Sequence, residues 1–233
     1  AQDEGVNVEF ESIILDDHPV IIHSPADAIR HGLGMLHQDP LDVPPLRVID
    51  NFILGRSGGL FPNRTNAIRD FKSLAEQFDF NLDPEVYVDT LTVGERQQLE
   101  ILRLIWLGAR ALIFDEPTTG ISAAQKVKLF AALRLLAEQG KTVLFVSHKL
   151  EDVEGLCHRV AVLRQGHLVG EASPPYSTRK LVEMMFGKTF AVGKRNPCST
   201  RDVVLALHTM SVEDYRLKIR SVDLDVHCGE VIG

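Results

Sequence analysis

The sequence has little that would place it in a membrane or in an oxidising compartment. Its longest apolar stretches, such as residues 142–146, are far shorter than the roughly 20 residues that a membrane-spanning helix needs. The chain of 233 residues contains three cysteines, which are Cys157, Cys198 and Cys228. Because this number is odd and the cysteines are scattered, we expect a reducing, cytosolic setting without a disulfide framework. Any contact with a membrane then runs through a partner protein.

An excess of positive charge is also missing. Lysine and arginine number 25 against 32 aspartates and glutamates, which gives a formal net charge of -7. Nucleic-acid backbones select basic faces, so this balance argues against nucleic acid as the main partner. Hydrophobic residues make up 45% and charged residues 24%, values that are ordinary for a soluble globular protein. The length allows one large domain, or one domain with part of another.

The first part of the chain changes from strand-like to helical patterns. Residues 7–15 begin with alternating polar and apolar side chains, which predicts a half-buried strand. Ser24 followed by Pro25 predicts a helix that runs to about His31, with Ser24 as its N-cap. Further elements are expected as a turn at 16–19, a short strand at 35–37 and a mostly helical region at 46–108.

Strands and helices alternate in the middle of the chain, which predicts an α/β fold. Residues 111–115 are a continuous apolar run ending in acid, typical of a parallel strand buried on both faces. Residues 123–138 predict an amphipathic helix. Its apolar stripe contains Val127, Phe130, Leu133 and Leu136. The other predicted elements are strands at 142–146 and 159–164, helices at 149–157 and 178–186, and a hairpin through 167–169.

The composition changes near the end of the chain. Residues 187–201 are polar and basic and contain Gly and Pro, which is typical of a linker. We therefore divide the chain into a first domain at 1–186, a linker at 187–201, and the opening strands of a second domain at 202–233. We further expect residues 203–233 to pair with residues 7–15, because each set has one apolar and one polar face. Residues 230–233 would then lie beside strand 111–115.

Asp115 and Glu116 stand at the end of the apolar strand at 111–115. Open α/β folds bind ligands at the carboxyl edge of their sheet. A carboxylate there can hold Mg²⁺, directly or through water, and the next carboxylate can orient or deprotonate an attacking water. A strand followed by a plain acidic turn is the alternative, and these two residues alone do not decide between them.

Residues 91–95 (LTVGE) precede a predicted helix. The hydroxyl of Thr92, the glycine at Gly94 and the free amides of a helix N-terminus would together form an anion site. The alternative is a capping box, with Thr92 as the N-cap and Glu95 three residues on. Taken alone, the residues favour the capping box.

Three further positions complete the set of candidates. His148 follows the strand at 142–146, where a histidine can contact a γ-phosphate and stabilise charge in a transition state. Gln38 follows the strand at 35–37 and can bind Mg²⁺ and water together. The polar loop at 118–122 (TTGIS) can contact a facing subunit. Taken singly, His148 is better explained as a surface histidine in a helix-capping region, and Gln38 as a loop residue.

The order and spacing of these motifs resemble one family. Gln38, LTVGE, LIFDEPT at 112–118 and VSHKL at 146–150 are similar to the Q-loop, signature, Walker B and H-loop of ABC transporter ATPases. The resemblance covers almost the whole chain. HQDPLDVPPLRVIDNFILG at 37–55, LEILRLIWLGARALIFDEPT at 99–118 and RVAVLRQGHLVG at 159–170 resemble the tandem ATPases of simple-sugar and nucleoside importers. VPPL and GAR favour the nucleoside, basic-membrane-protein branch.

This resemblance implies a P-loop NTPase core with an antiparallel β subdomain and a helical subdomain. It implies ATP and Mg²⁺ as cofactors, with Glu116 as the catalytic base, His148 at the γ-phosphate, and Asp115 and Gln38 at the metal. The signature residues Thr92, Val93, Gly94 and Glu95 would contribute to the ATP site of a second ABC ATPase domain. That domain would lie on the same polypeptide or in a dimer mate. Transmembrane permease subunits are the implied partners, at the cytoplasmic face of the cell membrane.

The sequence departs from the family in one motif above all. It contains no G-x-x-x-x-G-K-[ST], and its three Gly-Lys pairs, at 140, 187 and 193, lack the earlier glycine. That loop supplies the main grip on the β- and γ-phosphates. We therefore expect an ATPase in the intact protein and no activity in this chain alone. Two alternatives stay open, a non-hydrolysing coupling module and a soluble ABC ATPase that is not tied to transport.

Overall fold

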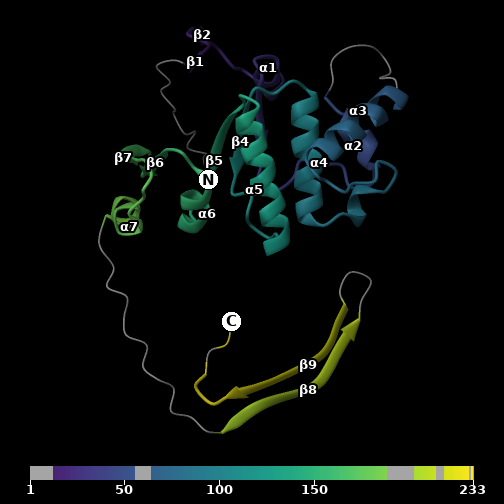
Figure 1. Cartoon of the computed structure of the whole chain (residues 1–233), viewed down its shortest axis with the longest axis vertical. Helices are drawn as coiled ribbons and strands as arrows, with labels where there is room; N and C mark the ends of the chain where they lie inside the picture. The colour runs from purple at the N-terminus through teal and green to yellow at the C-terminus, as the bar shows by residue number, and fades with distance from the viewer. Residues whose placement is uncertain (1–12, 56–63, 188–201, 214–217, 231, 233) are drawn as a thin grey trace, which may run out of the picture. The chain divides into compact units, whose positions relative to one another are not determined.

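A computed structural model describes residues 13–55, 64–187, 202–213, 218–230 and 232 of the chain. The chain divides into two compact units, residues 1–187 and residues 188–233 (Figure 1). The first unit contains all of the candidate site residues. Each unit is described by itself below.

The described part of the first unit begins with a hairpin and a short helix. β1 (Ile13–Leu15) and β2 (His18–Val20) pair antiparallel, and the turn residues Asp16 and Asp17 both have a positive φ, of 50° and 63°. The predicted strand at 7–15 is confirmed only at its end, since residues 7–12 lie outside the described residues. The turn is shorter than predicted, because His18 and Pro19 belong to β2. Helix α1 (Pro25–Arg30) starts at its predicted N-cap, where the Ser24 side chain accepts a hydrogen bond from the Asp27 amide.

Three parallel strands form the central sheet. They are β3 (Leu33–Leu36), β4 (Ala111–Asp115) and β5 (Thr142–Val146), in the order β3-β4-β5. Leu36 pairs with Phe114, and Asp115 pairs with Val146. All three strands therefore end at the same edge of the sheet, and the residues that follow them are brought together there.

Only one face of this sheet is well buried. Leu112 and Phe114 of β4 are fully buried in the main core cluster, together with residues of helices α4 (Val93–Trp106) and α5 (Ala123–Glu138). On the other face, Leu144 and Val146 of β5 are 56% and 44% exposed. The prediction that strand 111–115 is buried on both faces is therefore wrong, since its other residues are only half-buried.

The region that was predicted to be mostly helical contains α2 (Val48–Ile53), α3 (Arg64–Gln77), the 3-10 helix η1 (Val88–Thr90) and α4. Aromatic side chains hold it together. The Phe52 ring meets Phe71 edge-on, with 5.2 Å between centroids, and lies 4.6 Å from the ring of Trp106. These contacts join α2, α3 and the end of α4 into one packed group.

Helix α5 has the predicted bounds, 123–138, but its buried face differs from the predicted stripe. Phe130, Leu133 and Leu136 are buried as expected, whereas Val127 is 70% exposed. Residues in a helix are about 100° apart, so Val127 lies about 120° around the axis from Leu133. Leu129 and Ala132 take its place on the buried face.

The remaining elements of the first unit follow the predicted order. They are α6 (Leu150–Leu156), the antiparallel pair β6 (Val160–Arg164) and β7 (His167–Ala172), and α7 (Thr178–Phe186). Helix α7 ends at Gly187, whose φ of 72° suits a glycine C-cap. None of the helices in the described ranges has the length and apolar character needed to span a membrane.

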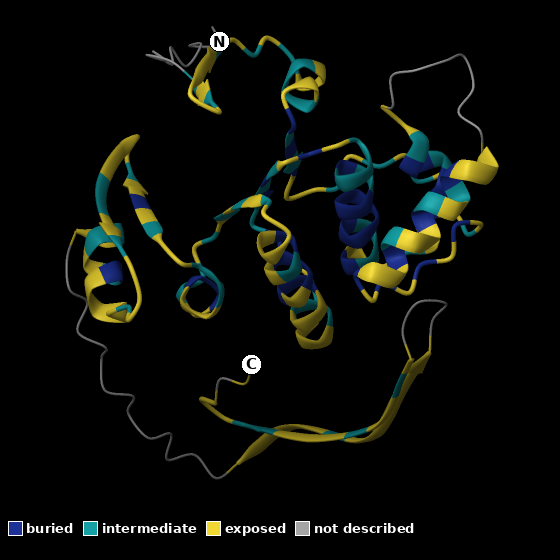
Figure 2. Cartoon of the chain, turned by 45° about the horizontal axis from the view of Figure 1, so that its top comes forward, coloured by how far each residue is buried: buried dark blue, intermediate teal, exposed yellow. Residues whose placement is uncertain are grey.

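The second unit contains two antiparallel strands, β8 (Val203–Glu213) and β9 (Lys218–His227). Most of their residues are exposed (Figure 2). The expected pairing with residues 7–15 stays a prediction, because residues 7–12 are not described. The expected place of residues 230–233 beside strand 111–115 is wrong, since β4 already has β3 and β5 as its two neighbours. Within the predicted linker at 187–201, residues 188–201 lie outside the described ranges.

Candidate functional site

Four of the predicted site residues lie at the carboxyl edge of the central sheet. Gln38 follows β3, Asp115 and Glu116 end and follow β4, and His148 follows β5. The parallel pairing of the strands places them at this shared edge, as the sequence predicted.

Glu116 is held in a constrained backbone conformation. Its φ is 50°, a left-handed value that costs free energy in a residue other than glycine. The Glu116 amide donates to the carbonyl of Val146 at 3.0 Å, which fixes the residue against the end of β5. Strain of this kind is common at functional sites and persists only where the surroundings enforce it.

The side chains of Glu116 and His148 meet across the edge. Oε1 of Glu116 lies 2.6 Å from Nδ1 of His148. The Glu116 side chain is 20% exposed, and the His148 side chain is 67% exposed. The carboxylate is thus partly shielded, while the imidazole is largely exposed to solvent.

A metal ion at this edge would need ligands beyond the His, Cys, Asp and Glu side chains that the structure describes. No group of three or more His, Cys, Asp or Glu side chains in the described ranges is arranged to hold one. The oxygen donors at the edge are the Asp115 carboxylate and the Gln38 amide. One carboxylate with one amide suits Mg²⁺ that is otherwise held by water and phosphate oxygens.

The predicted signature turn forms a complete capping box at the start of α4. The Thr92 hydroxyl accepts from the Glu95 amide at 3.3 Å, and Oε2 of Glu95 accepts from the Thr92 amide at 2.8 Å. The same Oε2 accepts from the Thr92 hydroxyl at 2.7 Å. Val93 is 43% exposed and Gly94 is buried. Both explanations of LTVGE are compatible with this geometry, because a capped helix N-terminus also presents amides to an anion.

The signature turn and the sheet edge form two separate groups. In the described part of the chain, no hydrogen bond or ion pair joins Thr92 or Glu95 to Glu116 or His148. The structure therefore places Gln38, Asp115, Glu116 and His148 at one sheet edge, and Thr92, Val93, Gly94 and Glu95 at the start of α4.

The loop at 118–122 is anchored to α6 and to the residues before it. Thr118 is buried, and its carbonyl accepts from Nζ of Lys149 at 3.0 Å. Asp152 of α6 is fully buried and forms an ion pair with Lys126 of α5. Burial alone would raise the pKa of Asp152, but the neighbouring Lys126 and Thr118 side chains and the charges of Lys126 and Lys149 lower this pKa overall.

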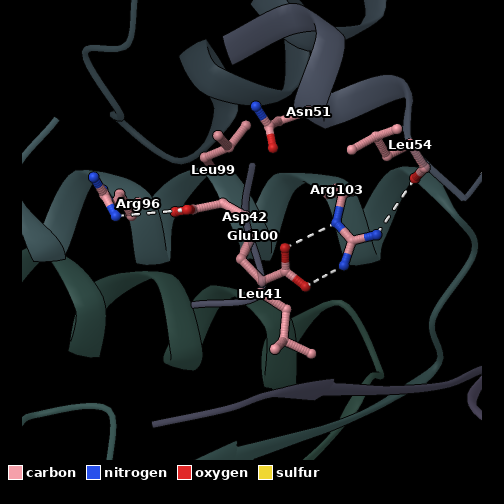
Figure 3. Close-up of a pocket in the computed structure, with 8 residues that line it drawn as sticks. All are labelled: Leu41, Asp42, Asn51, Leu54, Arg96, Leu99, Glu100 and Arg103. Carbon is pink, nitrogen blue, oxygen red and sulfur yellow. Dashed lines mark hydrogen bonds and ion pairs between the residues drawn. The ribbon is translucent and has the colours of Figure 1, made fainter. Parts of the chain in front are cut away.

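A small pocket of about 30 Å³ lies between the segment after Gln38 and helices α2 and α4 (Figure 3). Buried Asn51 of α2 bonds both the amide and the carbonyl of Val43, at 2.8 and 3.1 Å. Arg103 of α4 donates to Glu100 at 2.8 Å and to the Leu54 carbonyl at 3.3 Å. The Asn51 bonds tie the Gln38 segment to α2, and the bond from Arg103 to Leu54 joins α4 to the end of α2.

Asp42 is the least satisfied charged group in this pocket. It lies 3.5 Å from Arg96, and its side chain is 7% exposed. Its Oδ2 atom is buried without a hydrogen-bond partner in the described residues. Burial raises the pKa of Asp42, the Arg96 charge opposes this shift, and the charge of Glu100 adds to it.

Sequence reasoning missed Gln125 as a residue of the site. Gln125 accepts from the Ser122 amide at 3.0 Å and donates to the Thr92 hydroxyl at 2.9 Å. The S-x-x-Q pattern at 122–125 is a capping-box signature that could have been found in the sequence. The bond to Thr92 could not, because it joins residues on different helices.

Comparison with known proteins gives a consistent result. A family model described as ABC transporter matches residues 6–119. The chain is 37% identical over 224 residues to the ribose import ATP-binding protein RbsA 1 of Rubrobacter xylanophilus, covering 95% of this chain and 44% of that protein. It is 30% identical over 218 residues to the nucleoside import ATP-binding protein NupA of Lactococcus lactis subsp. cremoris, covering 91% of this chain and 43% of the relative.

Solved structures agree with this assignment at the level of the fold. A nucleotide-free ATP-binding cassette from an ABC transporter superposes with a TM-score of 0.63 at 18% identity, over 76% of this chain and 77% of that one. The sequence relatives are longer, and this chain spans less than half of their length. Over nearly its whole length the chain is thus similar in sequence to the ATP-binding proteins of ABC importers, and it has the fold of an ABC transporter cassette.

Proposed function

We propose that the intact protein is the ATP-binding and ATP-hydrolysing subunit of an ABC importer for simple sugars or nucleosides. The observation that carries this proposal is the Glu116–His148 contact at the carboxyl edge of the sheet, beside Asp115. The relatives are named as ribose and nucleoside import proteins, which supports the substrate class. The VPPL and GAR stretches favour a nucleoside.

In this proposal each residue at the sheet edge has one task. Glu116 orients the attacking water and accepts its proton. His148 contacts the γ-phosphate and stabilises the charge that develops there. Asp115 and Gln38 would hold Mg²⁺, which would neutralise charge on the phosphates when bound. The contact between Glu116 and His148 fixes the base relative to the group that contacts the γ-phosphate.

The signature residues serve a second ABC ATPase domain, on the same polypeptide or in a dimer mate. The lack of a hydrogen bond or ion pair from Thr92 or Glu95 to Glu116 or His148 in the described residues supports this arrangement, because the signature turn would then contribute to the opposite ATP. The amides at the start of α4 and the Thr92 hydroxyl are the groups that would contact its phosphates.

Transmembrane permease subunits are the proposed partners, with the protein on the cytoplasmic face of the cell membrane. The bonds of Asn51 to Val43 and of Arg103 to the Leu54 carbonyl support a mechanical role for this region. The first connect the Gln38 segment to α2 and the second joins α2 to α4, so movement at the nucleotide would reach a permease docked on the helical region.

A non-hydrolysing coupling module is the second candidate. It is favoured by one observation, the lack of a G-x-x-x-x-G-K-[ST] motif in the sequence. We accordingly propose that this chain alone neither binds MgATP tightly nor hydrolyses it, and that the phosphate loop belongs to the intact protein. A soluble ABC ATPase that is not tied to transport is the less favoured alternative, given the importer names of the relatives.

The test is ATP hydrolysis by the intact protein in proteoliposomes that contain its permease. The proposal predicts hydrolysis that the permease and its solute stimulate, and uptake of a nucleoside or sugar that depends on ATP. Binding of ATP without turnover would favour the coupling module. Turnover that is indifferent to the permease would favour a soluble ATPase.

A further inference from the structure

Helix α5 starts with a capping box of its own. The Ser122 hydroxyl accepts from the Gln125 amide at 3.2 Å, and Oε1 of the Gln125 side chain accepts from the Ser122 amide at 3.0 Å. This reciprocal pair ends the loop at 118–122 and fixes it to the helix. One end of the Gln125 side-chain amide is therefore committed to the loop.

The other end of the same amide reaches the signature turn. Nε2 of Gln125 donates to the Thr92 hydroxyl at 2.9 Å. That hydroxyl also accepts from the Glu95 amide and donates to the Glu95 carboxylate. A hydroxyl has one hydrogen and two lone pairs, so all of its hydrogen-bonding capacity is used. Gln125 thus joins two capping boxes, one at the start of α4 and one at the start of α5.

Close packing at Gly94 reinforces this link. A Cβ atom at Gly94 would lie 2.6 Å from Cδ of Gln125 and 2.7 Å from its Nε2. A side chain at position 94 would therefore displace the Gln125 amide, and the glycine lets this amide pass directly over the first turn of α4. Gln125 is half-buried there, and Gly94 is buried.

We propose that Gln125 is a positioning residue that holds the signature turn and the loop at 118–122 as one unit. The inference rests on the proposed function in one respect, since both segments are the ones that would face a second ATPase domain. Gln125 contacts no substrate in this account. It acts through Thr92, by fixing the orientation of the hydroxyl that the signature presents.

Two substitutions distinguish the hydrogen bond of Gln125 to Thr92 from its hydrogen bond to Ser122. Gln125→Glu keeps an oxygen that can accept from the Ser122 amide but has no N–H for Thr92. Gln125→Met has a similar size and removes both bonds without adding charge. The matched control is Gln139→Met, at the exposed C-cap of the same helix.

The first measurement is amide hydrogen exchange in this chain. In Gln125→Glu we expect the Glu95 amide to exchange about fivefold faster than in wild type. This ratio corresponds to the free energy of about one capping interaction. The Ser122 amide should exchange at nearly the wild-type rate. In Gln125→Met both amides exchange faster, and in the Gln139→Met control neither does. Unchanged exchange at Glu95 in both Gln125 variants would overturn the link.

The second measurement is a double-mutant cycle on ATP turnover in the intact protein. Gln125→Met should lower kcat about fivefold with little change in KM, because the signature is engaged only after ATP is bound. In a Thr92→Val background the same substitution should have almost no further effect, since its target is gone. Fully additive losses would overturn the positioning role even if the exchange result holds. An intact wild-type protein without turnover would instead refute the proposed function, and hydrogen exchange would still decide whether the link exists.

Discussion

Nδ1 of His148 and Oε1 of Glu116 lie 2.6 Å apart, and the two residues come from the ends of adjacent strands. The contact joins the carboxylate that follows β4 to the imidazole that follows β5. Since the Glu116 amide also bonds the Val146 carbonyl, both the backbone and the side chain of Glu116 are fixed relative to β5. The two side chains are therefore held in contact at the edge of the sheet.

Loss of the imidazole should affect turnover more than ATP binding. We expect His148→Ala in the intact protein to lower kcat at least about tenfold, because Glu116 loses its partner and the γ-phosphate loses a stabilising contact. His167→Ala, at an exposed position of β7, is the control and should keep wild-type turnover. Steady-state ATP hydrolysis measures both. A His148→Ala protein with full kcat would show that the contact has no part in the reaction.

The buried ion pair of Asp152 should make stability depend on pH. The pKa of Asp152 is lowered in the folded state because Lys126, Thr118 and Lys149 outweigh the effect of burial. The stabilisation that ionised Asp152 gives to the folded chain is therefore fully present at a pH above the pKa of Asp152 in the unfolded chain. It is lost as the pH falls through the pKa of Asp152 in the folded chain.

Asp152→Asn should accordingly destabilise this chain at pH 7 by about 2 kcal/mol. This value lies below that of a fully buried pair, because Lys126 is 38% exposed. The difference from wild type should shrink as the pH falls below about 4. Urea unfolding over a pH series measures it, with exposed Glu151→Gln as the control. A difference that does not vary with pH would contradict the assignment.

Asp42 should show the opposite pH dependence. Burial raises the pKa of Asp42 in the folded state, so the folded chain favours the protonated form. That stabilising effect is present at acidic pH and is lost as the pH rises through the folded pKa. Asp42→Asn does not titrate, so its stability relative to wild type should increase from about pH 4 to neutral pH. Thermal unfolding across this range is the measurement, and a relative stability that falls toward neutral pH would refute it.

A substitution on the exposed face of the sheet should affect the stability of this chain and of the intact protein differently. Parallel sheets are normally covered on both faces, yet Leu144 is 56% exposed. In this chain Leu144→Asn should change the unfolding free energy by less than about 0.5 kcal/mol. A further layer packed on this face in the intact protein should raise the cost to about 2 kcal/mol or more.

Leu112→Ala is the control for that comparison. Leu112 is fully buried on the opposite face, so its truncation should cost about 2–5 kcal/mol in both proteins. Equal and small effects of Leu144→Asn in both would show that the face stays open in the intact protein.

Local patterns predicted most elements of this chain, and contacts across the fold explain where they failed. Ser24-Pro25 marked the start of α1, and the apolar runs marked β4 and β5, because these signals depend on neighbouring residues. Val127 was placed on the wrong side of α5, since which face is buried depends on where the helix docks. The open side of β4 and β5 was missed for a related reason, because a strand's sequence does not reveal whether a second layer is present.

In the candidate site, too, local patterns predicted some features and missed the contacts between distant segments. Asp115, Glu116 and His148 could be predicted because the ends of parallel strands share one edge. The bond from Gln125 to Thr92 spans 33 positions in the sequence, and no pattern within either segment indicates it. The Asp152–Lys126 pair is similar, since each residue alone reads as an ordinary charge on the surface of a helix.

The central claim is that Glu116 acts in hydrolysis and not in binding. The most direct measurement compares Glu116→Gln with wild type in the intact protein, using calorimetry for MgATP binding and phosphate release for turnover. The account predicts an ATP dissociation constant within about threefold of wild type and a kcat lowered by about 10²–10⁴-fold, because the substitution removes only the water-orienting or proton-accepting role. A comparable loss of ATP binding, or a turnover that stays at the wild-type level, would contradict it.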